Sequence, residues 1–369
     1  MSDIQQNTLY LTTPASYVAR DHLTLQIEVP VFPEELPRAE RTRERATDWR
    51  KLSIPIHMLE SICVFGPSTI SAPALDLCWE HGVAVNYLSE YGHLQARLTG
   101  VADTSVTLRR AQFRVADEPA KCAALSRQII AGKLQNSRNS VQRAARETEV
   151  AEERARLTEA VDALARQIQD LGRWTAEDLG REGALDSLRG AEGMGSATYF
   201  GVFTLLLKQQ REEFAFANRS RRPPRDRINC LLSFLYALVR HDCIAALTAA
   251  GLDPFVGFLH AERPNRPALA LDLMEEFRPW LADRLAVTLI NRQQLGSGHF
   301  QPREGGAVEF TDAGRKAVIT AYQQRKQERL THPLLEQEFR IGQLAFVQAR
   351  VLARTLRRDL PDYIPFVSK

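Results

Sequence analysis

The sequence has no apolar run of about eighteen residues, so we expect no segment that spans a membrane. Its first residues, Met1 to Leu11, lack both a basic leader and an apolar core, and we expect no secretion signal. The five cysteines are odd in number and form no CxxC pair, which argues against a disulfide framework and a cysteine zinc site. These absences predict a cytoplasmic protein with reduced thiols and no membrane partner.

Net charge is also small. Forty-eight Lys and Arg residues face 45 Asp and Glu residues, which leaves +3. This sum does not decide whether the protein binds nucleic acid, because the distribution of charge matters more than its total. A chain of 369 residues with 44% hydrophobic side chains can bury a sizeable core, and its length favours two domains.

The first hundred residues contain short runs of β-branched and aromatic residues that turn residues separate. These runs predict strands at 7–12, 22–30, 61–65 and 83–88, a hairpin over 91–98 and a helix over 71–81. Residues 34–50 are charged and show no strand pattern, so we expect an exposed insertion there.

From about residue 108 the pattern becomes helical. Residues 108–172 have almost no Gly or Pro, and the part from 142 to 169 is rich in Arg, Glu and Ala. This part predicts a helical hairpin whose solvated face carries i,i+4 ion pairs. Further helices are predicted over 174–190, 196–217, 226–250, 267–292 and 312–358. The sequence therefore predicts a β-rich head followed by a large α-helical body.

A candidate metal site lies in GFLHAERPNRPALALDLMEEFRP, residues 257–279. His260 ends an apolar run, and Asp272 and Glu275 share one face of the following helix because they are three residues apart. Two such carboxylates repel each other unless a cation or a basic group lies between them, and a histidine with carboxylates suits Mg²⁺ or Mn²⁺. The alternative is a structural histidine beside a solvated helix flank. Spacing alone does not decide between Glu275 and Glu276 as the ligand. A core stripe is predicted at Leu269, Leu273, Phe277, Leu281 and Leu285.

Glu192 is the best candidate for a third acidic group. It lies in LRGAEGMGSATYF, residues 188–200, with Gly190, Gly193 and Gly195 around it. Glycine permits close backbone approach, here by a phosphate. The alternative is a simple turn before a helix.

A basic loop, NRSRRPPRDR, covers residues 218–227. Its proline pair favours an extended segment, and arginine suits bidentate contact with phosphate. A basic loop beside an acidic metal cluster is what a phosphodiester-processing enzyme requires. We expect DNA contacts from this loop and from the C-terminal helix, and Lys133 and Arg138 could extend the basic surface. The alternative is a solubilising loop. The candidate DNA-binding residues are Arg219, Arg221, Arg222, Arg225, Arg350 and Arg354.

Taken in order, these segments resemble the CRISPR-associated protein 1 family. The resemblance covers nearly the whole chain and includes NTLYLTTP, CVFGPSTISAPALDLCWEHGVAVNYLS, VTLRRAQFR, GKLQNSRNSVQRAAR, LRGAEGMGSATYFGVF, RSRRPPRDRINCLLSFLYALV, GFLHAERPNRPALALDLMEEFRP and QARVLARTLRRDLPDYIPF. The segments LRRAQFR and QARVLAR are most similar to the subtype I-C branch.

The resemblance implies an α+β fold with a small N-terminal β-sandwich-like dimerisation domain (1–100) and a large all-α catalytic domain (101–369). It places the metal ligands at Glu192, His260 and Glu275, and it makes Asp272 an additional catalytic acid beside the metal. The implied activity is that of a metal-dependent DNA endonuclease and integrase of CRISPR adaptation. Such an enzyme inserts short foreign DNA fragments (spacers) into the CRISPR array by attack of a 3′-hydroxyl on a phosphodiester. The implied partners are double-stranded and branched DNA (protospacer and repeat), a second copy of the chain, and CRISPR-associated protein 2.

The sequence departs from the family pattern at two places. Ala268 stands where many members have Ser, and the Arg/Glu-rich stretch 142–190 is longer than usual. Two other functions remain open at this stage. One is a helical metal-dependent phosphohydrolase acting on small phosphate esters, which would leave the arginine loop without a role. The other is a non-catalytic DNA-binding scaffold in which the acidic residues are structural.

Overall fold

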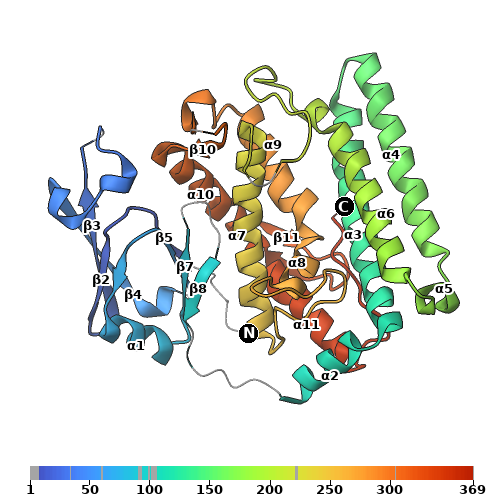
Figure 1. Cartoon of the computed structure of the whole chain (residues 1–369), viewed down its shortest axis with the longest axis horizontal. Coiled ribbons are helices and arrows are strands. Elements are labelled where there is room, and N and C mark those ends of the chain that lie inside the picture. The colour runs from blue at the N-terminus through green and yellow to red at the C-terminus, as the bar shows by residue number, and fades with distance from the viewer. Residues whose placement is uncertain are drawn as a thin grey trace. The chain divides into compact units, whose positions relative to one another are not determined.

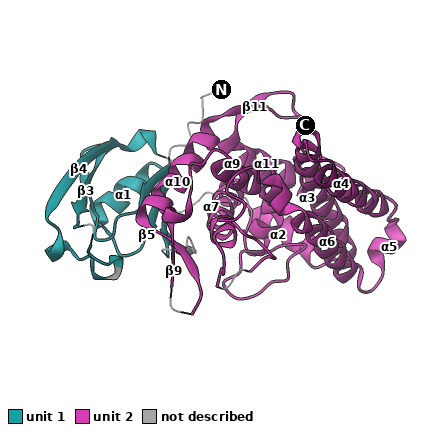
Figure 2. Cartoon of the chain, turned by 90° about the horizontal axis from the view of Figure 1, so that it is seen from above, with its two compact units in different colours: residues 1–103 teal, residues 104–369 magenta. Residues whose placement is uncertain are grey.

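The computed structural model describes residues 8–33, 35–59, 61–89, 94–98, 100, 106–220, 223–303 and 305–368. The chain divides into two compact units, Met1–Asp103 and Thr104–Lys369, which are coloured separately in Figure 2. Figure 1 labels their helices and strands.

The first unit contains two four-stranded sheets around one apolar core. One sheet has the order β4 (Asp48–Pro55), β3 (Thr24–Val31), β2 (Tyr17–Asp21) and β6 (Thr69–Ile70). The other has the order β1 (Thr8–Leu11), β5 (Ser61–Phe65), β7 (Ala84–Leu88) and β8 (Leu94–Leu98). Side chains from both sheets and from α1 (Ala72–Glu80) share the core. The α1 helix begins where Ser71 Oγ accepts the N–H of Ala74.

The predicted strands around β1, β3, β5 and β7 and the helix α1 are confirmed. Strand β8 pairs with β7 as the predicted hairpin requires, but residues 91–93 of that hairpin lie outside the described residues. Strands β2 and β4 were not predicted. Most side chains of β4 are exposed, so the strand shows no alternation of apolar and polar residues. Its start overlaps the predicted insertion, which also contains two short 3₁₀ turns at Arg38–Glu40 and Arg43–Arg45.

The second unit is built mainly from helices. Helices α3 (Pro119–Glu147) and α4 (Ala151–Gly172) form the predicted helical hairpin. Helix α7 (Arg227–Ala249) is long and apolar enough to cross a membrane by length and composition alone, but 72% of its apolar window is buried inside the structure. It is therefore explained as a core helix. The remaining helices are α2 (Val106–Ala116), α5 (Ala176–Gly180), α6 (Ala184–Gly201), α8 (Ala268–Met274), α9 (Arg284–Asn291), α10 (Asp312–Gln327) and α11 (Leu344–Leu356).

The α+β fold class is confirmed, although the helical unit also contains two short hairpins. One pairs β9 (Phe300–Pro302) with β10 (Val308–Phe310), and the other pairs β11 (Arg329–Thr331) with β12 (Glu338–Arg340). The second hairpin interrupts the predicted helix over 312–358. Pro333 lies between its strands, and a proline disfavours continuation of a helix.

The predicted helix over 267–292 contains a wide turn. Helix α8 is followed by a π-helical segment, η5 (Arg278–Asp283), and then by α9. The predicted stripe repeats every four residues, which is longer than the 3.6-residue turn of an α-helix and would drift around its surface. A π-turn takes more residues and reduces that drift. All five side chains of the stripe, from Leu269 to Leu285, are buried.

Candidate active site

Glu192 lies in the middle of α6, not in the turn that its glycine neighbours suggested. A side chain at Gly195 would overlap Leu134 of α3, so glycine lets the two helices pack closely. The carboxylate of Glu192 thereby reaches the α3 surface, where Lys133 Nζ donates to its Oε1. Ser196 Oγ donates to the same oxygen at 2.9 Å. Of the three glycines around Glu192, only Gly195 serves helix packing among the described residues, because Gly190 and Gly193 face open space.

His260 is held by the buried carboxylate of Asp272. Asp272 Oδ1 accepts the backbone N–H of His260 at 3.0 Å and lies 2.7 Å from the ring Nδ1. Its other oxygen accepts the N–H groups of Phe258 and Leu259 at 2.6 and 3.1 Å. An ionised carboxylate only accepts hydrogen bonds, so Nδ1 donates to Asp272 and Nε2 is the ring nitrogen that faces the cluster. Asp272 is fully buried, and it orients the imidazole from behind.

The loop that carries His260 packs tightly on α8. A Cβ at Gly257 would lie 2.7 Å from the carbonyl carbon of Ala268 and 2.8 Å from Asp272 Oδ2. Glycine and the small Ala268 therefore allow the loop backbone to approach the Asp272 carboxylate. On the other side, Arg189 Nε of α6 donates to the carbonyl oxygen of Leu259 at 2.8 Å.

If His260 holds a metal ion, replacing Asp272 by asparagine is expected to lower the affinity of the protein for Mn²⁺ by about 10- to 100-fold, the usual cost of losing a carboxylate behind a metal-binding histidine. An amide keeps the shape but cannot accept all four hydrogen bonds. The measurement is a titration of the protein with Mn²⁺. Asp253→Asn is the matched control, because among the described residues the Asp253 side chain caps only the backbone of Phe255. An unchanged Mn²⁺ affinity in Asp272→Asn would contradict the positioning role.

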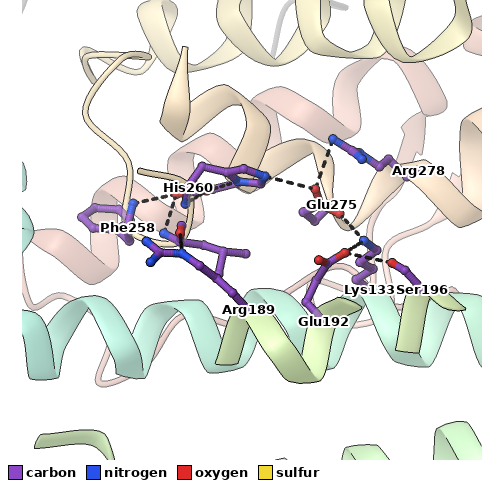
Figure 3. Close-up of polar contacts among 10 residues, drawn as sticks. Lys133, Arg189, Glu192, Ser196, Phe258, His260, Glu275 and Arg278 are labelled. Carbon is purple, nitrogen blue, oxygen red and sulfur yellow. Dashed lines mark hydrogen bonds and ion pairs between the residues drawn. The ribbon is translucent and has the colours of Figure 1, made fainter. Parts of the chain in front are cut away.

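Glu275 is the central carboxylate of the cluster. Its side chain is 2% exposed. Its Oε2 lies 2.7 Å from Lys133 Nζ, and its Oε1 lies 3.2 Å from Arg278 Nη2 and 3.7 Å from His260 Nε2 (Figure 3). Burial opposes ionisation of Glu275, but Arg278, Lys133 and His260 outweigh it and lower its pKa to about 2. The group is therefore a carboxylate at neutral pH.

The neighbouring Glu276 points to a different environment. Its carboxylate accepts hydrogen bonds from Tyr363 Oη, from the backbone N–H of Phe366 at 2.6 Å and from Gln348 Nε2 at 2.9 Å. Burial raises the pKa of Glu276 to about 7 in spite of these donors. Glu276 therefore anchors the C-terminal segment, and Glu275 is the carboxylate that faces His260.

The sequence suggested that Lys133 extends a basic surface, but its side chain lies buried between two carboxylates. The side chain is only 8% exposed, and its ammonium contacts both Glu192 and Glu275. A sequence signal was present, because Lys133 lies on the same face of α3 as the buried Ile129, Ile130 and Ser137. A lysine on a buried helix face requires a buried acidic partner.

The chemistry of the donor set fits a divalent cation. One imidazole whose Nε2 faces the cluster and two carboxylates suit Mg²⁺ or Mn²⁺. Glu192 and Glu275 both contact the Lys133 ammonium, and Glu275 also faces His260 Nε2 at 3.7 Å (Figure 3). Within the described residues, no group of three or more His, Cys, Asp or Glu is arranged closely enough to hold a metal ion. The ammonium of Lys133 lies where the two carboxylates would share a cation.

The predicted DNA-binding arginines have different environments. Arg219 is half-buried, donates to Asn229 Oδ1 and stacks over Tyr236 at 5.2 Å. Arg225, Arg350 and Arg354 are exposed, and none of the three forms an ion pair with a described residue. Arg350 and Arg354 lie one turn apart on α11, so they share a face. The remaining two, Arg221 and Arg222, lie outside the described residues.

One basic cavity adjoins the cluster, and a second shares part of its lining with the first. The first has a volume of about 360 Å³, and Lys133, Arg219 and Arg278 line it together with Tyr236 and Asp283. The second, of about 800 Å³, shares Tyr199 and Pro279 with the first. Its cationic lining was not predicted from the sequence and outnumbers its acidic lining, Glu147 and Glu328. The cationic residues are Arg143, Arg146, Lys208, Arg284, Arg292 and Arg325.

A strand-rich unit and a helical unit that holds carboxylates, an imidazole and basic cavities define a candidate metal-dependent site for phosphate chemistry. A family model described as "CRISPR associated protein Cas1" matches residues 9–324. The chain therefore belongs to the Cas1 family, as the sequence resemblance predicted.

The chain is similar to curated members of this family over nearly its full length. It is 42% identical to "CRISPR-associated endonuclease Cas1 1" of Moorella thermoacetica over 361 residues, which are 98% of each chain. It is also 42% identical to "CRISPR-associated endonuclease Cas1 2" of Rhodospirillum rubrum over 366 residues, again 98% of each chain.

Solved structures share the fold. A "Casposase bound to integration product" aligns with a TM-score of 0.79 and 20% identity, and the match covers 97% of this chain and 93% of that one. A Cas1 protein from Thermotoga maritima aligns with a TM-score of 0.74 and 21% identity, covering 98% of this chain and 100% of that one.

Proposed function

We propose that the protein is a metal-dependent DNA endonuclease and integrase of CRISPR adaptation. It inserts short foreign DNA fragments into the CRISPR array by attack of a fragment's 3′-hydroxyl on a phosphodiester. The contacts that link Glu192, Glu275 and His260 beside a cavity with a cationic lining carry the proposal. The similarity to proteins named Cas1 endonucleases over 98% of the chain supports it.

We assign Glu192, His260 Nε2 and Glu275 as ligands of Mg²⁺ or Mn²⁺. Such a cation supplies a Lewis acid that polarises a phosphate oxygen and stabilises the charge that develops on it. Asp272 keeps His260 in the tautomer that presents Nε2, and it acts as a positioning residue. Arg278 and Lys133 bring N–H donors to Glu275, next to the proposed metal position. There they stabilise negative charge on the phosphate. Water in place of the 3′-hydroxyl gives hydrolysis.

The DNA contacts are proposed mainly at the phosphate backbone. Arg219 lines the small cavity, and the exposed Arg225, Arg350 and Arg354 carry unpaired guanidinium groups among the described residues. Arg221 and Arg222 are proposed as further contacts. The large cavity, with its six cationic side chains, suits a polyanion better than a small phosphate ester. It therefore favours DNA over the phosphohydrolase alternative.

The assembly and location extend the proposal. We assign the first unit to homodimerisation and the second to catalysis, with double-stranded and branched DNA and CRISPR-associated protein 2 as partners. A solved structure titled "Cas6-RT-Cas1--Cas2 complex" shares the fold with a TM-score of 0.75 and 22% identity; it covers 99% of this chain and 36% of that one. A cytoplasmic location agrees with five cysteines that are all free and buried. The subtype I-C assignment stays a prediction.

A substrate panel tests the function. Branched DNA and a plasmid bearing a repeat are expected to be cleaved or joined in Mn²⁺ or Mg²⁺, whereas a chelator abolishes both reactions and added metal restores them. Mononucleotides are expected to release no phosphate. Hydrolysis of mononucleotides without any reaction on DNA would favour the phosphohydrolase. DNA binding without reaction in any divalent metal would favour the scaffold.

A further inference from the structure

The charged side chains of the site balance one another before any metal is added. Glu192 and Glu275 supply two negative charges, and Lys133 and Arg278 supply two positive charges in direct contact with them. Asp272 is occupied by backbone N–H groups and by the His260 ring. The four side chains Glu192, Glu275, Lys133 and Arg278 therefore carry no net charge, which limits the electrostatic cost of placing them in a partly buried site.

A divalent cation upsets this balance. It would compete with Lys133 for the same two carboxylates, because the Lys133 ammonium bridges Glu192 and Glu275. The metal and the four side chains that it would join would then carry two surplus positive charges, and Lys133 and Arg278 would lose their counter-charges. Uncompensated charges in a buried site are costly, so the metal alone binds against an electrostatic penalty.

The small cavity offers the compensation. Lys133 and Arg278 both line it, together with Arg219, and the long lysine side chain can turn its ammonium towards it. A phosphodiester in this cavity would accept hydrogen bonds from Lys133 and Arg278 once the metal has displaced them from the carboxylates. The DNA phosphate would supply the negative charge that Lys133 and Arg278 lose when the metal binds. The metal would in turn free these two side chains to contact the phosphate.

We propose that Lys133 is an internal counter-ion that competes with the divalent metal, and that this competition makes metal binding and DNA phosphate binding cooperative. The inference rests on the proposed function, because it uses the same metal site. It predicts weak metal affinity in the DNA-free protein and a rise in affinity when DNA is present. Lys133 acts here as a positioning residue whose charge is exchanged between carboxylates and phosphate.

The test is the affinity of the DNA-free protein for Mn²⁺, measured by electron paramagnetic resonance of the unbound ion. Lys133→Met removes the competing charge and is expected to bind Mn²⁺ about tenfold more tightly than the wild type, a coupling of ordinary size between linked charges. Lys133→Arg keeps the charge and is expected to bind as weakly as the wild type. Lys121→Met is the matched control on the same helix, because among the described residues Lys121 pairs only with Glu118 at the surface.

The second measurement uses the wild type alone and stays decisive if Lys133→Met does not fold. A short blunt DNA duplex is expected to raise the wild-type Mn²⁺ affinity by about tenfold. A wild-type Mn²⁺ affinity that is the same with and without DNA overturns the inference. A folded Lys133→Met that binds Mn²⁺ no more tightly than the wild type also overturns it. If His260→Ala leaves Mn²⁺ binding unchanged, the proposed metal site itself is overturned, and the inference fails with it.

Discussion

Replacing His260 by alanine is expected to lower both cleavage and strand transfer on branched DNA by about 10³-fold or more. The imidazole is the one nitrogen donor among the three assigned ligands, and its Nε2 faces Glu275 at 3.7 Å. The local fold should survive the change, because Asp272 keeps the backbone N–H groups of Phe258, Leu259 and residue 260. DNA binding should stay within about twofold, because backbone contacts set the affinity.

The experiment compares His260→Ala with His57→Ala at matched protein concentrations. His57 is an exposed histidine of the strand-rich unit, in a short 3₁₀ turn. Reaction rates are measured on branched DNA in Mn²⁺, and DNA affinity is measured separately in the absence of metal. Full activity in His260→Ala would remove this residue from the catalytic assignment. Loss of DNA binding together with activity would show that the histidine acts through the fold.

Much of the fold follows from short-range patterns, and the misses have identifiable causes. Periodicity predicted the helical hairpin of α3 and α4 and most core strands, because these elements bury one regular face. It failed where a pattern is weak or continues past a break. Strand β4 is largely exposed, and the β11–β12 hairpin interrupts a helical pattern at Pro333.

Less of the candidate site could be predicted from the sequence, because contacts between distant segments define it. Helical spacing places Asp272 and Glu275 on one face, but spacing does not reveal that Asp272 holds the His260 loop from behind. The glycines near Glu192 suggested either close approach by a phosphate or a turn before a helix, whereas Gly195 serves the packing of α6 on α3. The buried position of Lys133 was not predicted, because its acidic partners lie on α6 and next to α8, which local sequence does not bring together.

Replacing Glu275 and Glu276 by glutamine, one at a time, compares two adjacent carboxylates, and we expect large effects only at Glu275. Glu275→Gln should lower activity by about 10³-fold. It should also lower the free energy of unfolding of the metal-free protein by about 3 kcal/mol, because it leaves Lys133 and Arg278 with one fewer buried counter-charge.

Glu276→Gln should keep activity within about threefold and change the free energy of unfolding by about 1 kcal/mol or less. Its amide oxygen can accept from Phe366 N–H and Gln348, while its NH₂ group donates to Tyr363 Oη in place of the present acceptor. A neutral side chain suits this pocket, because burial already raises the pKa of Glu276 to about 7.

The pH dependence of stability separates the two residues further. The pKa of Glu275 is lowered, so the stability from its ion pairs is present above its ordinary value of 4.5 and is lost as the pH falls towards 2. The pKa of Glu276 is raised, so the stability from its protonated form is present below 4.5 and is lost as the pH rises through about 7. As the pH rises from 4.5 to about 7, the thermal unfolding temperature of Glu276→Gln should therefore fall less than that of the wild type. Equal declines, or equal loss of activity in the two variants, would contradict the division of roles, which depends on Glu275 facing His260 while Glu276 anchors the C-terminal segment.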